Sequence, residues 1–461
     1  MTVTVVIPQT MAEELRSVAR LPDETAGVML AGIAQAPNGD IKLLGRQMRW
    51  VEESAYLRRE AYGLTIRSDG YVHALAEAET LGAACIWVHT HPGEVASPRP
   101  SDHDRIVDQE IADLFRLRSG SPYYGALIFS PHSSELTFTG HLQREGCKSA
   151  EIERLWEVGE RWRLTRAFDS ALPRLSNIFD RNVRAFGTAV QETLGDLRIG
   201  IVGCGGTGSA VGEQLIRLGV RHITLIDPDE LSETNLTRVY GSTKSDVGDP
   251  KVQVLARHLA RIAPELRCET VRSMLTVESA ARHLIACDVV FGCTDDNAGR
   301  LVLSRLATYL MTPVIDCGVL LSSDAACGLV GIDGRVTILT PGQACLVCRG
   351  RIDLARARAE LLTPDERVRR EDEGYAPALG RTEPAVVAFT TLVGATAVSE
   401  LLERLIGYGP EPRPSEILLR CHEREISTNI ALPLEGHYCH PSSCKLGVGI
   451  TQPFLEQTWP T

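Results

Sequence analysis

Two histidines and an aspartate between His89 and Asp104 are the residues of this chain best suited to hold a catalytic metal ion. Residues 84–88 are an apolar run that predicts a strand, and a strand turns alternate side chains to one face. His89 and His91 are therefore expected to point the same way and to share one ion. Two imidazoles and the Asp104 carboxylate leave the fourth tetrahedral position of zinc open to water, so the segment predicts a hydrolytic zinc site.

Ser101 and Asp104 also have the spacing of a helix N-terminal cap, in which a serine and an acid satisfy backbone N–H groups. Apolar residues between 106 and 115 recur at roughly helical spacing, which predicts a helix from Asp104 to about Leu117. Taken alone, the Ser-x-x-Asp spacing favours an ordinary cap. The two preceding histidines favour a metal ligand at Asp104.

A glutamate, then His-x-His-Pro, then Ser-x-x-Asp resembles the signature of the JAMM (MPN-plus) metalloprotease family. The resemblance implies zinc ligands at His89, His91 and Asp104, and a Ser101 hydroxyl that supports the tetrahedral intermediate. Glu24, just before the apolar run 25–32, fits the family's general base, which exchanges a proton between the attacking water and the leaving amine. The alternative for Glu24 is a solvated carboxylate at a strand end. Nine residues separate His91 from Ser101, where familiar family members have seven.

A second chemistry is indicated by the segment 197–208, a buried strand running into a glycine-rich turn. Glycines let the backbone approach phosphate, and the predicted helix over 209–218 offers free N–H groups at its start. The turn's candidate nucleotide-binding residues are Gly203, Gly205, Gly206 and Gly208. A further predicted strand, 222–226, ends at Asp227, where a carboxylate can hold a ribose hydroxyl. These features equally suit an NAD-dependent dehydrogenase.

The polar residues that follow favour nucleotidyl transfer over hydride transfer. After Asp227 come Asp229, Asn235, Arg238 and Lys251, and a predicted strand over 289–291 leads to the doublet Asp295-Asp296. A nucleotidyl transfer needs cations that neutralise a triphosphate and an acid that holds magnesium near the reacting phosphorus. Each residue by itself is typical of a charged surface, but the set in this order predicts ATP and Mg²⁺ as cofactors.

This set is similar to the adenylyltransferase domain of ubiquitin-activating enzymes and their bacterial ThiF/MoeB/HesA relatives. The resemblance implies that Asp227 binds the ribose and that Asp295 coordinates magnesium, although Asp296 could exchange roles with it. It implies phosphate contacts from Asn235, Arg238 and Lys251. It also implies a homodimer, in which Arg181 reaches the ATP of the neighbouring copy.

The 13 cysteines are expected to be reduced thiols, because no secretory signal opens the chain. Two pairs, Cys345 with Cys348 and Cys439 with Cys444, predict a four-sulfur structural zinc, and His440 could replace one thiolate. The ThiF-type family has such a zinc, usually with two residues between the later cysteines rather than the four found here. The cysteines in apolar or glycine-rich contexts are expected to be packed, inert thiols: Cys85, Cys204, Cys287 and Cys293.

The motifs divide the chain into a JAMM metalloprotease domain over 1–147, a connector over 148–180 and an adenylating domain over 181–461. Apolar residues between 149 and 168 form one broad stripe, which predicts a connector helix. The expected fold class is α/β: a JAMM α/β domain, the helix, and a Rossmann-like ThiF domain with its zinc.

A net charge of −11 disfavours nucleic acid as a partner. No apolar run approaches membrane-spanning length, so a cytoplasmic protein is expected.

The pairing of the two predicted activities narrows the substrate. One activity attaches AMP to a terminal carboxylate and the other cleaves amide bonds, so a shared substrate is a ubiquitin-like protein with a flexible tail. The fusion resembles prokaryotic ubiquitin-like operons and predicts activation combined with processing or deconjugation. Activation and trimming of a sulfur-carrier protein for thiocarboxylate formation is the alternative. A scaffold that binds the modifier without turnover is disfavoured, because neither set of candidate catalytic residues is broken.

The lack of a cysteine in one segment of the sequence predicts how the activated tail is passed on. Ubiquitin-activating enzymes usually carry it on a cysteine after the first zinc pair, but no cysteine occurs between Cys348 and Cys421. The corresponding place, 372–377, offers Tyr375, whose hydroxyl is too basic to replace a thiolate. We therefore expect transfer to an external nucleophile, such as a conjugating enzyme or a sulfur donor. The competing possibility is recruitment of another thiol, such as Cys421 or Cys327.

Overall fold

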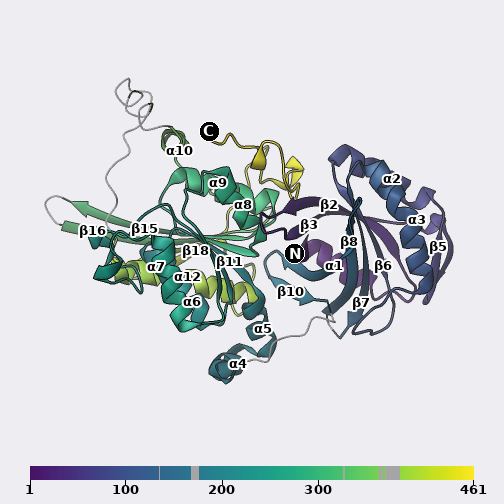
Figure 1. Cartoon of the computed structure of the whole chain (residues 1–461), viewed down its shortest axis with the longest axis horizontal. Helices are drawn as coiled ribbons and strands as arrows, with labels where there is room; N and C mark the ends of the chain where they lie inside the picture. The colour runs from purple at the N-terminus through teal and green to yellow at the C-terminus, as the bar shows by residue number, and fades with distance from the viewer. Residues whose placement is uncertain are drawn as a thin grey trace. The chain divides into compact units, whose positions relative to one another are not determined.

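The structure of the chain is a computed structural model that describes residues 1–133, 135–167, 176–324, 328–362, 366, 369 and 385–460. The chain divides into two compact units (Figure 1). The first unit contains Met1–Pro173, Tyr309–Met311 and Leu446–Thr451. The second contains Arg174–Thr308, Thr312–Lys445 and Gln452–Thr461.

The first unit is built on an eight-stranded sheet in the order β1-β3-β2-β6-β7-β8-β9-β10. Because β1 pairs in parallel with both β3 and β9, the sheet closes on itself. The strands are β1 (Val3–Pro8), β2 (Ala26–Gln35), β3 (Ile41–Trp50), β6 (Ala84–Thr90), β7 (Tyr123–His132), β8 (Glu135–Arg144), β9 (Ala150–Val158) and β10 (Arg163–Arg166). A separate two-stranded ribbon joins β4 (Tyr56–Glu60) to β5 (Gly63–Ile66).

Alternation along β2 and β6 gives the closed sheet a core on each face. Met29 and Ile86 belong to the core that contains residues of α1 (Gln9–Val18). Val28 and Trp87 belong to the other core, with residues of α2 (Asp69–Leu81) and α3 (Asp102–Ser119). This period of two is expected for strands that are covered on both sides. The helix predicted to begin near Asp104 is present as α3.

The predicted connector helix is wrong. Residues 150–158 form β9 and residues 163–166 form β10, and both strands belong to the sheet of the first unit. Ile152, Leu155 and Trp156 are completely buried, so β9 carries apolar side chains on both of its faces. A strand buried on both faces loses its polar alternation, and the remaining apolar spacing resembled that of a helix.

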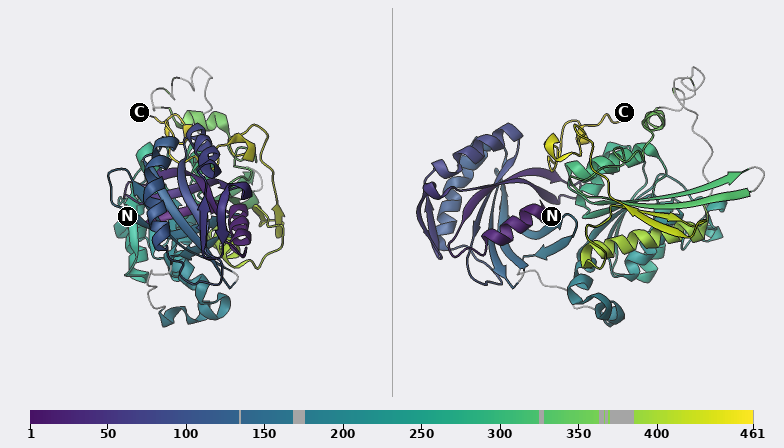
Figure 2. Two further views of the ribbon diagram at one scale, coloured as in Figure 1. Left: turned by 90° about the vertical axis from the view of Figure 1, so that its right-hand side faces the viewer. Right: turned by 180° about the vertical axis from the view of Figure 1, so that it is seen from behind.

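The second unit has the doubly wound arrangement expected from its sequence. Its sheet order is β13-β12-β11-β14-β15-β16-β17-β18, parallel from β13 to β15 and antiparallel beyond. In Figure 2, β15 and β16 reach beyond the rest of the sheet. The strands are β11 (Arg198–Val202), β12 (His222–Ile226), β13 (Arg267–Val271), β14 (Val289–Gly292), β15 (Val314–Asp324), β16 (Gly328–Leu339), β17 (Glu416–Arg420) and β18 (Glu425–Asn429).

Helices cover both faces of this second sheet, with α8 and α9 on one face and α6, α7 and α12 on the other (Figure 1). The helices are α4 (Asp180–Phe186), α5 (Thr188–Asp196), α6 (Gly206–Arg217), α7 (Lys251–Ile262), α8 (Glu278–His283), α9 (Asn297–Tyr309), α10 (Leu354–Glu360) and α12 (Val387–Ile406). None of the helices in the described ranges is both long and apolar enough to cross a lipid bilayer.

Candidate functional site

The turn between β11 and α6 leaves no room for a side chain at Gly203 or at Gly208. Gly203 has a φ of +91°, and a Cβ atom on it would lie 2.5 Å from the carbonyl oxygen of Cys293. A Cβ atom on Gly208 would lie 1.8 Å from the carbonyl oxygen of Gly203. The Asp227 carboxylate fixes the turn by accepting hydrogen bonds from the backbone N–H groups of Cys204 at 2.6 Å and Asp229 at 2.9 Å.

A pocket of about 600 Å³ lies where the parallel strands of the second unit end. It brings together segments that follow β11, β12 and β14, as expected for ligand sites of doubly wound sheets. Its lining includes the predicted residues Gly203, Gly205, Gly206, Asp227, Asp229, Asn235, Arg238, Lys251, Asp295 and Asp296. The predicted residue Gly208 is not part of this lining and instead packs against Gly203.

The charges of the pocket are arranged in local pairs. Burial raises the pKa of Asp227, and the nearby Lys251 ammonium partly offsets that effect. Lys251 Nζ lies 2.6 Å from Asp229 Oδ2. Arg238 donates a hydrogen bond to the carbonyl oxygen of Thr234 at 2.8 Å, which leaves other N–H groups of its guanidinium for a ligand. Both cations are thus held at the pocket wall.

The two acids of the doublet have different surroundings. Asp296 accepts hydrogen bonds from the Thr294 hydroxyl and from the backbone N–H of Gly299, one on each carboxylate oxygen, at the start of α9. Asp295 is exposed and lines the pocket. Its carboxylate is therefore the better placed of the two to meet a cation.

Arg181 lies on α4 and is not among the residues that line this pocket in the described part of the chain. The sequence-based prediction gave it a role toward the ATP of a neighbouring copy, which is consistent with a position outside its own pocket. That role stays a prediction.

In the first unit, the structure brings His89, His91 and Asp104 together, with ligand atoms within 4.8 Å of one another. Asp104 Oδ1 lies 3.5 Å from His89 Nε2, and Asp104 Oδ2 lies 3.6 Å from His91 Nε2. The antiparallel register of β2 and β6 pairs Ala26 with His89, so Glu24 lies near the histidines. Glu24 Oε1 is 3.9 Å from His91 Nε2.

The polar atoms of this cluster are better placed to coordinate a cation than to hydrogen-bond to one another. Both ring nitrogens of His89 are buried without a hydrogen-bond partner among the described residues. Burial would raise the pKa of Asp104, but the nearby imidazoles of His89 and His91 outweigh burial and hold that pKa well below its usual range. Burial raises the pKa of Glu24 to about 7, which suits a group that both accepts and returns a proton near neutral pH.

Ser101 forms the cap that its spacing predicts. Its Oγ accepts a hydrogen bond from the N–H of Asp104 at 3.1 Å, and its own N–H donates to Asp104 Oδ2 at 2.7 Å. The ordinary cap and the candidate metal site therefore coexist, because one carboxylate takes part in both. The cap fixes Asp104 at the start of α3 with its second oxygen toward His89.

A third cluster, in the second unit, gathers Cys345, Cys348, His437 and Cys439 within 4.8 Å. The Sγ atoms of Cys345 and Cys348 are 3.8 Å apart, and His437 Nδ1 lies 3.3 Å from Cys348 Sγ and 3.2 Å from Cys439 Sγ. Zinc–sulfur bonds of about 2.3 Å in a tetrahedron separate neighbouring sulfurs by about 3.8 Å, so the cluster has the dimensions of a structural zinc site.

The fourth member of this cluster differs from the prediction. His437 takes the place predicted for Cys444, which is exposed at the end of the short turn Pro441–Ser443. Three of the four residues between Cys439 and Cys444 form that turn, which carries the second thiol away, whereas His437 is only two residues from Cys439. His440 also does not join the cluster, since its Nδ1 is hydrogen bonded to Ser442. The pattern His-x-Cys could have identified His437 from the sequence.

We predict that His437→Ala will lose about one zinc equivalent per chain, because a closed structural site needs four ligands. Zinc content of the purified protein, measured by atomic absorption, checks this. Cys444→Ser is the matched control and should keep its zinc. Zinc lost from Cys444→Ser but retained by His437→Ala would restore the four-sulfur assignment.

Comparison with known proteins places the second unit in a family. The model of the ThiF family matches residues 179–437. Molybdopterin-synthase adenylyltransferase of Escherichia coli K12 is 29% identical over 250 residues, which are 53% of this chain and 88% of that protein. Sulfur carrier protein ThiS adenylyltransferase of the same strain is 31% identical over 213 residues, or 46% of this chain and 74% of that protein.

Other matches are less similar or less complete. Ubiquitin-like modifier-activating enzyme 5 of Oryza sativa is 28% identical over 210 residues, which cover 43% of this chain and 46% of that protein. Among solved structures, E. coli MccB with ATP superposes with a TM-score of 0.45 at 19% identity, covering 58% of this chain and 75% of that one. Since the family model matches more than half of the residues, the chain belongs to the ThiF family.

Proposed function

We propose that the second unit activates the carboxyl terminus of a ubiquitin-like or sulfur-carrier protein by transferring AMP to it from ATP. The observation that carries this proposal is the single pocket that collects Asp227, Arg238, Lys251 and Asp295 from separate segments at the ends of parallel strands. The names of relatives support the substrate class, since they include a sulfur-carrier adenylyltransferase and a ubiquitin-like modifier-activating enzyme.

In the proposed reaction a carboxylate oxygen attacks the α-phosphorus of ATP. A carbon–oxygen–phosphorus link forms, the bond to the bridging oxygen of the β-phosphate breaks, and pyrophosphate leaves. Two anions must approach each other, so cations near the phosphates supply most of the rate. Arg238 and Lys251, with the free N–H groups at the start of α6, would neutralise the triphosphate, and Asp227 would hold the ribose.

Asp295 would hold the magnesium ion that accompanies ATP. The fit rests on its exposed carboxylate in the pocket lining and on the hydrogen bonds that occupy both oxygens of Asp296. Bound magnesium would supply positive charge beside the reacting phosphate. Arg181 from a second copy would complete the site in the proposed homodimer.

We predict that Asp295→Ala and Lys251→Ala will each reduce ATP–pyrophosphate exchange at least about 10²-fold, because each removes charge stabilisation at the phosphates. Exchange is measured with a ubiquitin-like or sulfur-carrier protein from the same organism as the substrate. Asp296→Asn should chiefly weaken the start of α9 and lower thermal stability. Exchange that survives in Asp295→Ala and fails in Asp296→Asn would move the magnesium role to Asp296. Oxidation of a hydroxy substrate with NAD, without any exchange, would return the dehydrogenase interpretation.

We further propose that the first unit is a zinc-dependent amide hydrolase that acts on the same kind of protein tail. His89, His91 and Asp104 would hold the ion, which would supply Lewis acidity at the scissile carbonyl. The support is their mutual distance and the two buried His89 nitrogens without hydrogen-bond partners. Glu24 would take a proton from the attacking water and deliver it to the leaving nitrogen, while Ser101 would stand at the oxyanion side.

We predict that His89→Ala will lose both the zinc of the first unit and the cleavage of a tail-extended or conjugated partner protein. Glu24→Gln should keep the zinc and lose about 10²–10⁴-fold in rate, because a general base contributes roughly that factor and is not a ligand. Zinc content and intact mass of the partner protein are the measurements. Full cleavage by a metal-free variant that lacks both His89 and His91 would exclude this activity.

The two activities together favour activation combined with processing or deconjugation of a ubiquitin-like modifier. The names of two E. coli relatives favour the alternative, activation and trimming of a sulfur carrier. A conjugating-enzyme gene beside this one would support modification of proteins, and a cofactor-biosynthesis cluster would support sulfur transfer.

The surroundings of Cys317 support direct transfer from the adenylate to an external nucleophile. Cys293 and Cys317 line the pocket, but a hydrogen bond with Cys293, together with burial, keeps the pKa of Cys317 well above its usual range. Cys421 is half-buried on a turn after β17. Two further positions lie outside the described residues: Cys327 and the segment around Tyr375.

We predict that this chain forms no stable thioester with its activated partner, because a thioester needs a thiolate within reach of the adenylate. Non-reducing electrophoresis after incubation with ATP and the partner protein should show no thiol-sensitive adduct. An adduct that disappears when one cysteine outside the zinc cluster is replaced, for example in Cys421→Ser, would contradict the prediction.

A further inference from the structure

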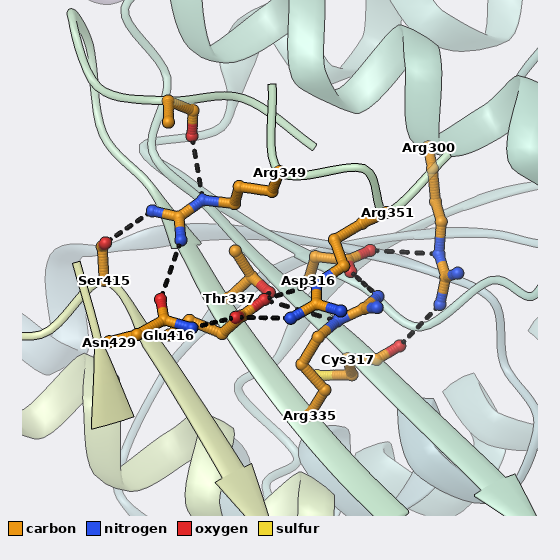
Figure 3. A network of polar contacts seen from close by, with 11 residues as sticks. Arg300, Asp316, Cys317, Arg335, Thr337, Arg349, Arg351, Ser415, Glu416 and Asn429 are labelled. Carbon is orange, nitrogen blue, oxygen red and sulfur yellow. Dashed lines mark hydrogen bonds and ion pairs between the residues drawn. The ribbon is translucent and has the colours of Figure 1, made fainter. Parts of the chain in front are cut away.

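Two buried carboxylates of the second unit belong to a network of polar contacts that contains several arginines (Figure 3). Asp316, on β15, is completely buried. Its Oδ1 lies 3.3 Å from Arg300 Nε, and its Oδ2 accepts a hydrogen bond from Arg335 Nη2 at 2.8 Å. One carboxylate therefore orients two guanidinium groups from different elements, α9 and β16.

The second carboxylate, Glu416 on β17, is 1% exposed and accepts hydrogen bonds from another arginine. Arg351 donates two hydrogen bonds to it, at 2.9 and 2.7 Å, in the bidentate arrangement favoured by guanidinium. Arg349 is bound instead by neutral oxygens, those of Ala344, Ser415 and Asn429. The network drawn in Figure 3 thus contains four arginines and two carboxylates, and it carries an excess of positive charge.

Arg300 is the arginine of this network that lines the pocket. Its Nη2 donates to the carbonyl oxygen of Cys317 at 3.3 Å, and its Nε faces Asp316 Oδ1, so both contacts leave Nη1 uncommitted. A guanidinium has five N–H donors, so Arg300 retains donors for a ligand. Its side chain is only 14% exposed, and an anion that it meets is therefore shielded from most of the solvent.

Gly318 keeps the space beside Arg300 open. A Cβ atom there would lie 3.4 Å from Arg300 Nη2 and 3.2 Å from Arg335 Nη2. Gly318 and Val319 line the pocket and are half-buried, and the next residue, Leu320, is 46% exposed. This end of the pocket therefore leads from two oriented cations to the protein surface along β15.

We infer that Arg300, oriented by Asp316, binds the terminal carboxylate of the protein substrate, whose last residues enter over Gly318. This inference rests on the proposed adenylation. The reaction must bring a carboxylate beside a triphosphate whose charge has the same sign, and Arg238 and Lys251 belong to a different segment, which runs from the end of β12 to the start of α7. Arg300 and Asp295 line the same pocket, and α9, which carries Arg300, begins two residues after Asp295, the acid assigned to magnesium.

The two residues have different roles in this inference. Arg300 touches the carboxylate through charge-assisted hydrogen bonds, which a lysine can replace only as a point charge. Asp316 is a positioning residue, because it is buried and reaches the substrate only through Arg300. Replacing Asp316 by asparagine keeps its size and removes the charge that orients the guanidinium.

The test compares binding of the ubiquitin-like or sulfur-carrier protein that supports exchange, prepared with a free or an amidated carboxyl terminus, in the presence of Mg²⁺ and a non-hydrolysable ATP analogue. The wild-type chain should prefer the free carboxylate by about tenfold or more, as one charged hydrogen bond provides. Arg300→Gln should abolish the preference, Arg300→Lys should restore part of it, and Asp316→Asn should reduce it. Affinity for the ATP analogue should change little.

Glu416→Gln is the matched control, since it removes an equally buried carboxylate of the same network that does not line the pocket. It should lose thermal stability and keep the carboxylate preference. A preference that persists in Arg300→Gln, one that the wild-type chain lacks, or an equal loss in Glu416→Gln would overturn the inference. Weaker binding of the ATP analogue to Arg300→Gln with an unchanged preference would make Arg300 a phosphate ligand. Absence of partner-dependent exchange in the wild-type chain would instead overturn the proposed adenylation itself.

Discussion

The backbone contact between Gly203 and Gly208 sets the shape of the second unit's site. With a side chain at either position, the strand β11 could not turn into α6 at this distance from β14. The close turn lets Asp227, at the end of β12, accept hydrogen bonds from two N–H groups, one of them in the turn. It also leaves the start of α6 open toward the pocket. Residues that follow three strands thereby reach one cavity, which is the general property of parallel sheets that bind nucleotides.

Carboxylates that lose water on folding orient the functional groups of both units. Asp227 is tied to backbone N–H groups, Asp316 to two arginines, and Asp104 to a helix cap and two histidines. Asp227 and Asp316 are buried and Asp104 is half-buried. A carboxylate withdrawn from water is costly unless it is paired or hydrogen bonded, so each of these groups restricts the arrangement of its neighbours. Burial would destabilise an isolated carboxylate. Because each of these carboxylates must therefore keep its partners, burial also makes the site rigid.

Much of each site could be predicted because its residues are close in sequence to a strand end. His89 lies at the end of β6, His91 directly follows that strand, and Asp227 follows β12, so local alternation and spacing were sufficient to predict that these residues come together. The failures concern contacts set by distant segments. Whether 150–158 is a helix or a strand depends on β1, which is more than a hundred residues earlier. His437 enters the cysteine cluster because of a turn geometry that cysteine spacing does not reveal. Likewise, the pairing of Arg300 with Asp316 requires the register of β14 and β15.

The chemistry proposed for the two units constrains their order of action. Adenylation needs a free terminal carboxylate, and hydrolysis of an amide bond produces one. If the first unit cleaves an extension or a conjugate bond, its product is the group that the second unit consumes. The reverse order, in which the adenylate is formed first and then hydrolysed, would only consume ATP. A carboxylate-specific contact at Arg300 would therefore give the second unit a way to distinguish the processed tail from the unprocessed one, because a tail with an extension lacks a terminal negative charge at that position.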